Sequence, residues 1–316
     1  MAWKDKLRRI KDELGGIVGD KEQSPSQAPP PVPPHPPNQP AVASVYWQPR
    51  FQPDVAIHID WDPKLGNGPD GWGNQELQHY TAAPENVFQQ ATKMFFACDS
   101  TAEGSLVIRA VANKDAPSAD RRYTSARLVS RQTLARDRGV LSAVILSPCA
   151  DGIWPAFWLL PQEPFAWPTD GEIDIAETWN GDCENHSCLH WGQHHEPQKH
   201  RVRGTRIRDM HARPVRYDFA WDQPGGQPGQ GRLLWYIDGR PVMKAAVPEG
   251  TRPLREMTIL LNVAMGGNVC AGKKPKNGCY DMVVYSLGLF DELDAGGWSR
   301  FERDWECGST PHGSTY

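Results

Sequence analysis

The chain has 316 residues, of which 39% are hydrophobic, so it is long enough to bury a sizeable core. Its formal net charge of −4 argues against a nucleic-acid-binding protein that relies on bulk positive charge. No apolar run reaches the roughly 18–20 residues that a membrane-spanning helix needs. Glycine and proline contribute 29 residues each, which favours turns and short strands, and 13 tryptophans offer flat, half-polar surfaces for ring-shaped ligands.

Residues 1–23 are predicted to form an amphipathic helical arm. Apolar side chains from Trp3 to Ile17 recur at steps of three and four, and charged side chains of opposite sign pair at i,i+4. We interpret this segment as a solvated arm. A docking or membrane-surface helix is the alternative, although the nearly balanced charge argues against anionic lipid.

Residues 24–44 are predicted to be a Pro-rich linker. Nine of the seventeen residues in 24–40 are proline, a composition that favours extended polyproline II structure and excludes a packed core. Such a segment can also be a ligand for an aromatic groove, but we prefer the linker.

Residues 45–316 are predicted to form one all-β domain. Short runs rich in β-branched residues alternate with turn clusters, and no long amphipathic helical window follows residue 45. Asp238-Gly239 between apolar residues predicts a hairpin turn. We therefore expect an antiparallel β-sandwich. Its predicted strand regions are 105–114, 139–148, 154–161, 172–177, 232–240, 257–267 and 280–290.

The spacing of three carboxylates is the most informative pattern in the chain. Glu172 and Asp174 are two residues apart and share one face of a strand, whereas Ile173 and Ile175 point to the other face. Glu177 is five residues from Glu172, an odd separation that would put it on the wrong face. A one-residue β-bulge near Ile175 would return Glu177 to the same face as the other two carboxylates.

This arrangement predicts a pair of catalytic carboxyl groups. Four strand steps give about 13 Å between the α-carbons of Glu172 and Glu177, and inward-leaning side chains leave about 5 Å between the carboxyl groups. That separation is typical of retaining glycosidases, which need one ionised and one protonated carboxyl. A solvated acidic face and a calcium site are the alternatives. Neighbouring tryptophans favour a sugar cleft; they are Trp158, Trp167, Trp179 and Trp191.

The acidic strand and its surroundings resemble glycoside hydrolase family 16, in its laminarinase-like, bulged E-x-D-x-x-E branch. The matching motifs are Glu172-Ile-Asp-Ile-Ala-Glu177, Trp154-Pro-Ala-Phe-Trp-Leu-Leu-Pro161, and the segments 71–81, 123–127, 189–192 and 261–268. The resemblance covers roughly residues 55–290. It implies a β-jelly-roll sandwich of two antiparallel sheets, with a concave cleft for a β-glucan.

The resemblance also implies roles for single residues. Glu172 would be the nucleophile, Asp174 its assisting carboxylate, Glu177 the acid/base, and His190 a cleft residue next to the leaving side. The other implied substrate-binding or bracing residues are Asn74, Glu76, Arg127, Trp154 and Trp158. With the three flanking tryptophans Trp167, Trp179 and Trp191, they complete the predicted site. Trp154 and Trp158 could instead pack in the core, and we expect at least one of them to do so.

The expected reaction is endo-acting hydrolysis of a β-glucan with retention, at β-1,3 or mixed β-1,3/1,4 linkages. A cell-wall transglycosylase using the same carboxylates and a non-catalytic glucan-binding protein are the alternatives. We expect a monomer whose partner is a β-glucan polysaccharide, with no nucleic acid and no transmembrane segment. No metal and no cofactor are predicted; a structural calcium ion stays an alternative.

The seven cysteines are an odd number, so they cannot all form intramolecular disulfides. The pairs Cys183/Cys188 and Cys270/Cys279 are disulfide candidates because each spans a short loop. The first pair, with neighbouring histidines such as His186, is also loosely compatible with zinc spacing. Local cysteine pairs favour an oxidising space, and the family resemblance implies an extracellular or cell-wall location. The N-terminal residues carry no recognisable signal peptide, so the sequence leaves the compartment open.

Overall fold

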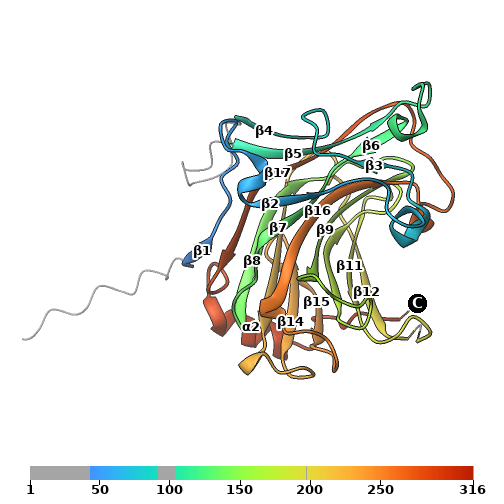
Figure 1. Cartoon of the computed structure of the whole chain (residues 1–316). Coiled ribbons are helices and arrows are strands. Elements are labelled where there is room, and N and C mark those ends of the chain that lie inside the picture. The colour runs from blue at the N-terminus through green and yellow to red at the C-terminus, as the bar shows by residue number, and fades with distance from the viewer. Residues whose placement is uncertain (1–42, 92–103, 197, 316) are drawn as a thin grey trace, which may run out of the picture. The chain divides into compact units, whose positions relative to one another are not determined.

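The computed structural model describes residues 43–91, 104–196 and 198–315. Within these ranges the strands form two sheets packed face to face, which is the predicted β-jelly-roll architecture (Figure 1). The predicted arm at 1–23 and nearly all of the predicted linker at 24–44 lie outside the described residues. In the part of the chain that is described, no helix is long and apolar enough to cross a membrane.

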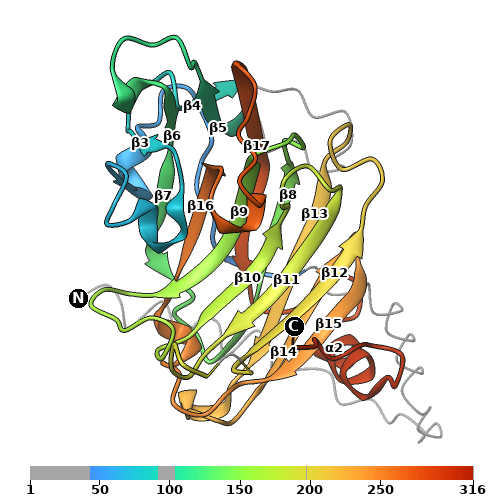
Figure 2. The ribbon, with the colours of Figure 1, turned by 90° about the vertical axis from the view of Figure 1, so that its right-hand side faces the viewer.

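One sheet, here called the front sheet, faces the viewer in Figure 2. It contains seven strands among the described residues, and all neighbouring strands in it pair antiparallel. In order across the sheet they are β12 (His200–Arg206), β11 (Glu184–His190), β10 (Glu172–Glu177), β9 (Ile153–Pro161), β16 (Met257–Met265), β7 (Arg127–Thr133) and β2 (Trp61–Lys64).

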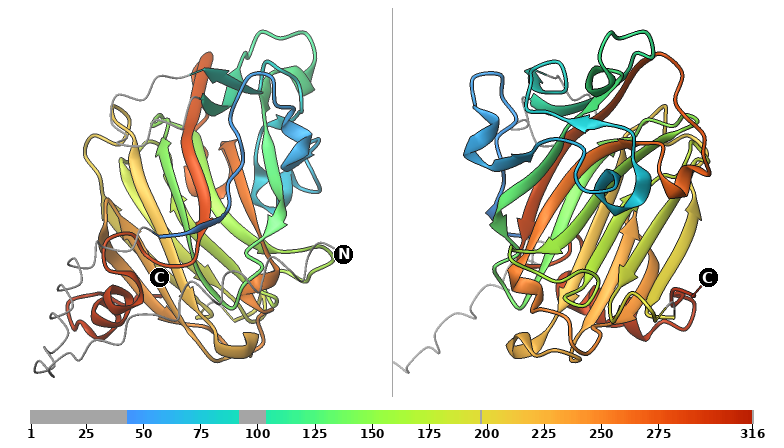
Figure 3. Two further views of the ribbon diagram at one scale, coloured as in Figure 1. Left: turned by 90° about the vertical axis from the view of Figure 1, so that its left-hand side faces the viewer. Right: turned by 45° about the vertical axis from the view of Figure 1, so that its right-hand side comes forward.

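The other sheet, here called the back sheet, is seen from its own side in the left view of Figure 3. It has ten strands within the described ranges, and only its short β3–β6 pair is parallel there. In order they are β15 (Arg240–Ala246), β14 (Arg232–Ile237), β13 (Val215–Asp222), β8 (Arg138–Leu146), β17 (Gly278–Phe290), β5 (Gly104–Ala112), β6 (Tyr123–Ser125) and β3 (His79–Tyr80), with β1 (Val45–Trp47) on β17 and β4 (Val87–Ala91) on β5.

The strand predictions are confirmed to within a few residues at their ends. The predicted strand at 172–177 is β10, and the predicted hairpin joins β14 to β15. Asp238 and Gly239 at its tip both have positive φ, 47° and 73°, as a type I′ turn requires. Ile237 consequently pairs with Arg240 across the turn.

Among the described residues the helical elements are short, and the longest of these was not expected. α2 (Gly297–Glu306) packs on the outer side of the back sheet, where Phe301 is buried with Leu234 and Tyr236. Its N-cap, Gly296, has no side-chain capping bond, so the usual helix-start signal is missing from the sequence. The remaining helical turns are η1 (Ile57–Ile59), η2 (Gly71–Gln75), η3 (Ala119–Arg121), η4 (Pro224–Gly226), η5 (Leu254–Glu256) and η6 (Asn268–Cys270).

The main core fills the space between the two sheets, and strand alternation decides which side chains it takes. On β9, Phe157 and Leu159 point into the core and are almost fully buried. Trp154 and Trp158 alternate with them and are half-buried on the opposite face. Neither tryptophan therefore belongs to the core. The front sheet has an open face that bears polar and aromatic side chains.

Both disulfide candidates are wrong, because the structure has free thiols at these four cysteines. Four extended residues of β11 separate Glu184 from Cys188, which alone spans about 13 Å, whereas bridged cysteines have α-carbons within about 7 Å. Cys183 instead contacts Cys149. Cys270 is buried in η6, whereas Cys279 is exposed on β17.

Candidate active site

A β-bulge in β10 brings the three carboxylates to the open face of the front sheet. The register of β10 against β9 shifts between Asp174, which pairs with Trp158, and Ala176, which pairs with Phe157. Ile173 and Ile175 lie in the core, as the alternation requires. The predicted bulge is therefore present at the predicted position.

Side chains from two other strands, β14 and β11, donate hydrogen bonds to the backbone carbonyl groups at the bulge. Trp235, on β14 of the back sheet, donates its indole N–H to the backbone oxygen of Asp174 at 3.0 Å. The amide of Asn185 and the hydroxyl of Ser187 donate to the backbone oxygen of Ile175 at 3.3 and 3.4 Å. Buried carbonyl groups need such partners, so these bonds stabilise the bulged conformation that orients the acidic side chains.

Indole N–H groups hold both glutamates. Trp167, which is 45% exposed in the loop before β10, donates to Glu172 Oε2 at 2.8 Å. Trp154 donates to Glu177 Oε1, and Trp179 donates to Glu177 Oε2, each at 3.0 Å. Three of the predicted tryptophans therefore contact the carboxylates directly, and both oxygens of Glu177 are held in place.

The environment of the two glutamates favours their protonated forms. Burial and the charge of Asp174 raise the pKa of Glu172 to about 7, against the lowering effects of His190 and of the bond from Trp167. Burial and the charge of Asp174 also raise the pKa of Glu177 well above its ordinary value. Glu177 therefore holds its proton to higher pH than an ordinary glutamate, whereas Glu172 loses its proton near pH 7.

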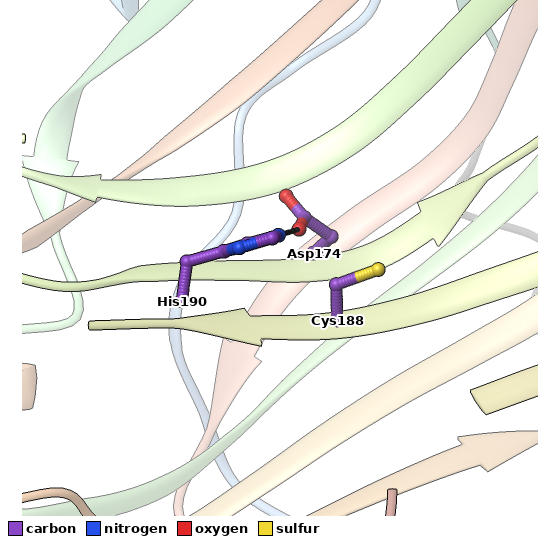
Figure 4. A group of neighbouring side chains, drawn as sticks. All are labelled: Asp174, Cys188 and His190. Carbon is purple, nitrogen blue, oxygen red and sulfur yellow. Dashed lines mark ion pairs between the residues drawn. The ribbon is translucent and has the colours of Figure 1, made fainter. Parts of the chain in front are cut away.

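Asp174 lies between the two glutamates in sequence and pairs with His190. His190 Nε2 is 3.5 Å from Asp174 Oδ2 (Figure 4). Burial lowers the pKa of His190, but the hydrogen bond to Asp174 and the charge of Glu172 outweigh burial and raise it to about 9. The imidazole is consequently positively charged at neutral pH. It offsets part of the negative charge of the acidic group.

Arg127 is held between two aromatic rings beside the carboxylates. Its guanidinium lies 4.6 Å from the ring of Trp72 and 4.7 Å from the ring of Trp158. Trp72 and Arg127 line a hollow of about 540 Å³ that also contacts Phe165. This arrangement gives the open face an aromatic and cationic wall, suited to contact a sugar ring and its hydroxyl groups.

Glu76 and Asn74 lie behind this wall in a buried network. Asn74 donates to Glu76 Oε1 at 3.3 Å, and the Gln78 amide donates to Glu76 Oε2 at 2.6 Å. Burial raises the pKa of Glu76, although the bond from Gln78 opposes this shift. Tyr80 also donates to Glu76 Oε2 at 3.3 Å, and it accepts a bond from Asn262 at 3.2 Å.

Asn262 connects this network to the open face. Its Oδ1 accepts the indole N–H of Trp158 at 2.7 Å. The contacts therefore place Glu76 as a residue that braces the wall.

Trp191 lies away from the carboxylates, although it directly follows His190 in the sequence. Its ring is stacked under Arg201 at 5.2 Å, and it lines a second hollow of about 490 Å³ with Lys244 and Trp305. Neighbouring residues of an extended strand point to opposite faces, which explains the separation. The position of Trp191 does not support its predicted place beside the carboxylates.

The structure separates the cysteine and the histidine that suggested a zinc site, Cys188 and His186, and gives each of them other partners. His186 contacts Asp182 at 2.9 Å and stacks on Trp179 with ring centroids 3.7 Å apart. Cys188 instead lies beside Asp174 and His190.

Three further residues at the site were not predicted from the sequence, each for a different reason. Cys188 is two residues before His190, so alternation places both on one face, but Cys188 was interpreted as half of a disulfide. Asn262 lies in a recognised motif without an assigned role. Trp235 gave no signal, because its partner is a backbone atom on another sheet.

The chain is similar in sequence and in fold to known glycoside hydrolases. A family model described as "XgeA-like, catalytic GH16 domain" matches residues 85–219. Glucan endo-1,3-beta-glucosidase A1 of Niallia circulans is 27% identical over 272 residues, which are 75% of this chain and 36% of that protein. The chain thus spans about a third of that relative's length.

Two matches come from Rhodothermus marinus. Its beta-glucanase is 29% identical over 221 residues, covering 66% of this chain and 70% of that protein. The X-ray structure of its laminarinase matches with a TM-score of 0.64 and 25% sequence identity, covering 80% of this chain and 98% of that one.

Proposed function

Because this chain belongs to glycoside hydrolase family 16, among its laminarinase-like members, we propose that it is a retaining, endo-acting hydrolase of β-glucan. The preferred linkage is β-1,3, or mixed β-1,3/1,4. The printed names of the relatives, a glucan endo-1,3-beta-glucosidase and a beta-glucanase, support this substrate class.

The observation that carries the proposal is the unequal environment of two glutamates on one bulged strand. Glu172 has a pKa raised to about 7 and is ionised at mildly alkaline pH, whereas burial and the neighbouring Asp174 hold the proton on Glu177. A retaining glycosidase needs one carboxylate to attack and one carboxylic acid to protonate the leaving oxygen. The two side chains supply these two states.

In the first step, a carboxylate oxygen of Glu172 forms a bond to the anomeric carbon while the glycosidic C–O bond breaks. The electrons of that bond go to the leaving oxygen, which takes the proton of Glu177. The product is a glycosyl ester on Glu172, and Glu177 is now a carboxylate. Asp174 and His190 sit beside the nucleophile and set its charge environment.

In the second step, Glu177 takes a proton from water while the water oxygen attacks the anomeric carbon. The ester bond breaks, Glu172 leaves as a carboxylate, and Glu177 is protonated again. Two inversions at one carbon give net retention. The cleft thus returns to its starting protonation state.

Azide rescue of two alanine variants tests the assignment of roles. With an aryl β-glucan oligosaccharide, Glu172→Ala with azide should yield the α-glycosyl azide, because azide replaces the missing nucleophile. Glu177→Ala with azide should yield the β-glycosyl azide, because azide displaces Glu172 from the ester. Without azide, each variant should lose at least about a thousandfold in kcat/KM on polysaccharide. Full activity of Glu172→Ala would overturn the proposal.

The matched control is Glu306→Ala, since Glu306 is exposed at the end of α2. It should cleave β-glucan like the unaltered protein.

A panel of laminarin, lichenan, xyloglucan, carrageenan and agarose identifies the substrate, with laminarin or lichenan expected to be cut into oligosaccharides. Chain lengthening with an added acceptor would instead identify a transglycosylase, and binding without any product would identify a glucan-binding protein.

A further inference from the structure

Four side chains form a two-by-two array on the open face of β10 and β11. The strands are antiparallel, with Glu172 opposite His190 and Asp174 opposite Cys188. Residues directly opposite on one face have β-carbons about 4.5–5.5 Å apart. Two carboxylates, a thiol and an imidazole are therefore immediate neighbours in this array.

Three of these side chains have the spacing of metal ligands. A carboxylate oxygen of Asp174, Cys188 Sγ and a ring nitrogen of His190 all lie within 4.8 Å of one another (Figure 4). His190 Nε2 and Asp174 Oδ2 are 3.5 Å apart. With Zn–N and Zn–O bonds of about 2.0 Å and Zn–S bonds of about 2.3 Å, the edges of a tetrahedral site are about 3.3–3.8 Å long. Small side-chain rotations would complete such a geometry.

An independent observation indicates that one oxygen of Asp174 lacks a partner. Asp174 Oδ1 is buried and has no hydrogen-bond partner among the described residues, and the whole residue is only 2% exposed. A buried carboxylate oxygen without a donor is costly and needs an explanation. Cys188, next to it, is 1% exposed. A cation between them would satisfy the free oxygen.

We propose that Asp174, Cys188 and His190 bind a thiophilic divalent cation, such as Zn²⁺ or Cd²⁺, and that this cation inhibits the enzyme. The mixed sulfur, nitrogen and oxygen donor set matches these ions and does not suit Mg²⁺ or Ca²⁺, which take oxygen ligands. The inhibitory part of this inference rests on the proposed function. The binding part stands on the geometry alone.

Binding changes the protonation of the site in a defined way. Cys188 releases its thiol proton to solvent and becomes a thiolate ligand, and His190 releases the proton of its imidazolium and binds through the freed nitrogen. The two positive charges of the cation replace the two released protons, so inhibition comes from the loss of Asp174 and His190 as free partners of Glu172. Asp174, held by the cation, no longer assists Glu172.

Titration of the purified, chelator-treated chain with CdCl₂ tests the binding part. Calorimetry measures affinity, and the ultraviolet thiolate-to-cadmium absorption reports whether a cysteine binds the ion. Cys188→Ser should lose this absorption at the tight site and weaken binding at least about tenfold. Cys279→Ser, which alters an exposed cysteine, and Cys149→Ser, which alters the Cys149–Cys183 contact, should leave the tight site unchanged. Circular dichroism checks folding, and Cys188→Ala replaces Cys188→Ser if the latter fails to fold.

Glucan cleavage measured in parallel tests the inhibitory part. The unaltered chain should lose activity as the tight site fills and regain it with EDTA, whereas Cys188→Ser should resist the same cadmium concentration. Equal cadmium affinity in Cys188→Ser and the unaltered chain would overturn the site. Tight binding at Cys188 with unchanged cleavage would overturn the inhibition. If no glucan is cleaved at all, the proposed function fails, while calorimetry still decides the metal site.

Discussion

Trp154 donates its indole N–H to Glu177, with 3.0 Å between Trp154 Nε1 and Glu177 Oε1. A hydrogen bond to a carboxylate favours the ionised form, so this contact lowers the pKa of Glu177 against the much larger effect of burial. The pKa of Glu177, the proposed acid/base residue, is thus adjusted by an indole on the neighbouring strand β9. The indole rings that we propose as sugar contacts on the open face thus also hydrogen-bond to the carboxylates.

Trp154→Phe should therefore move the alkaline limb of the pH profile of kcat/KM to higher pH. The substitution keeps the ring but removes the donor, so the pKa of Glu177 rises and the acid keeps its proton at higher pH. The measurement is a pH profile on a soluble β-glucan. Trp298→Phe is the control, because Trp298 donates to the Asp291 carbonyl outside the cleft. A limb that stays in place or moves to lower pH would contradict the prediction.

Asp174→Asn should move both limbs of the pH profile to lower pH. The charge of Asp174 raises the pKa values of Glu172 and Glu177, and its removal lets each glutamate ionise more easily. We also expect kcat to fall at least about tenfold, or about 1.4 kcal/mol in the barrier, because the contact with His190 is weakened. An unchanged acid limb would show that Asp174 does not set the charge of the nucleophile.

Arg127→Lys should weaken substrate binding more than it slows the chemistry. A cation stacked on an aromatic ring contributes about 0.5–2 kcal/mol, and the planar guanidinium is lost, so KM should rise roughly 2- to 30-fold. The kinetic constants on laminarin and the thermal unfolding midpoint separate binding from folding. Arg136→Lys, at the Tyr46 ring, provides the matched change outside the cleft. A loss confined to kcat would be inconsistent with a binding role.

His190→Gln should destabilise the protein more at pH 6 than at pH 10. The pKa of His190 is raised from 6.5 to about 9 in the folded chain. The stabilisation of the charged imidazole is therefore fully present below about pH 6.5 and is lost as pH rises through 9. Urea unfolding with EDTA present at both pH values measures the difference, with exposed His58→Gln as the control. An equal loss of stability at both pH values would contradict the assigned ion pair with Asp174.

Strand periodicity explains why the shared face of the three carboxylates could be predicted from the sequence. Glu172 and Asp174 share a face because the period of a strand is two, and the odd offset of Glu177 required a bulge that the structure contains. The same rule, applied one residue beyond His190, would have placed Trp191 on the other face. The separation of about 5 Å between the glutamate carboxyl groups stays a prediction.

Contacts between distant segments could not be predicted in this way. Nearness in sequence suggested a Cys183–Cys188 bridge, but an extended strand carries these cysteines apart and brings Cys188 to Asp174 on the next strand. The helix α2 lacks a capping side chain. Its apolar side chains are buried only by packing against the outer side of the back sheet. Such relationships depend on the tertiary fold.

The bond from Trp235 to the Asp174 carbonyl has a consequence for protein engineering. Loops around the open face can be exchanged without altering Trp235, which holds the bulge of β10 together with Asn185 and Ser187. A conservative change in the interior, such as Trp235→Phe, should weaken the bulge from an almost fully buried position. Random libraries should therefore yield inactive yet soluble clones that map to this buried tryptophan.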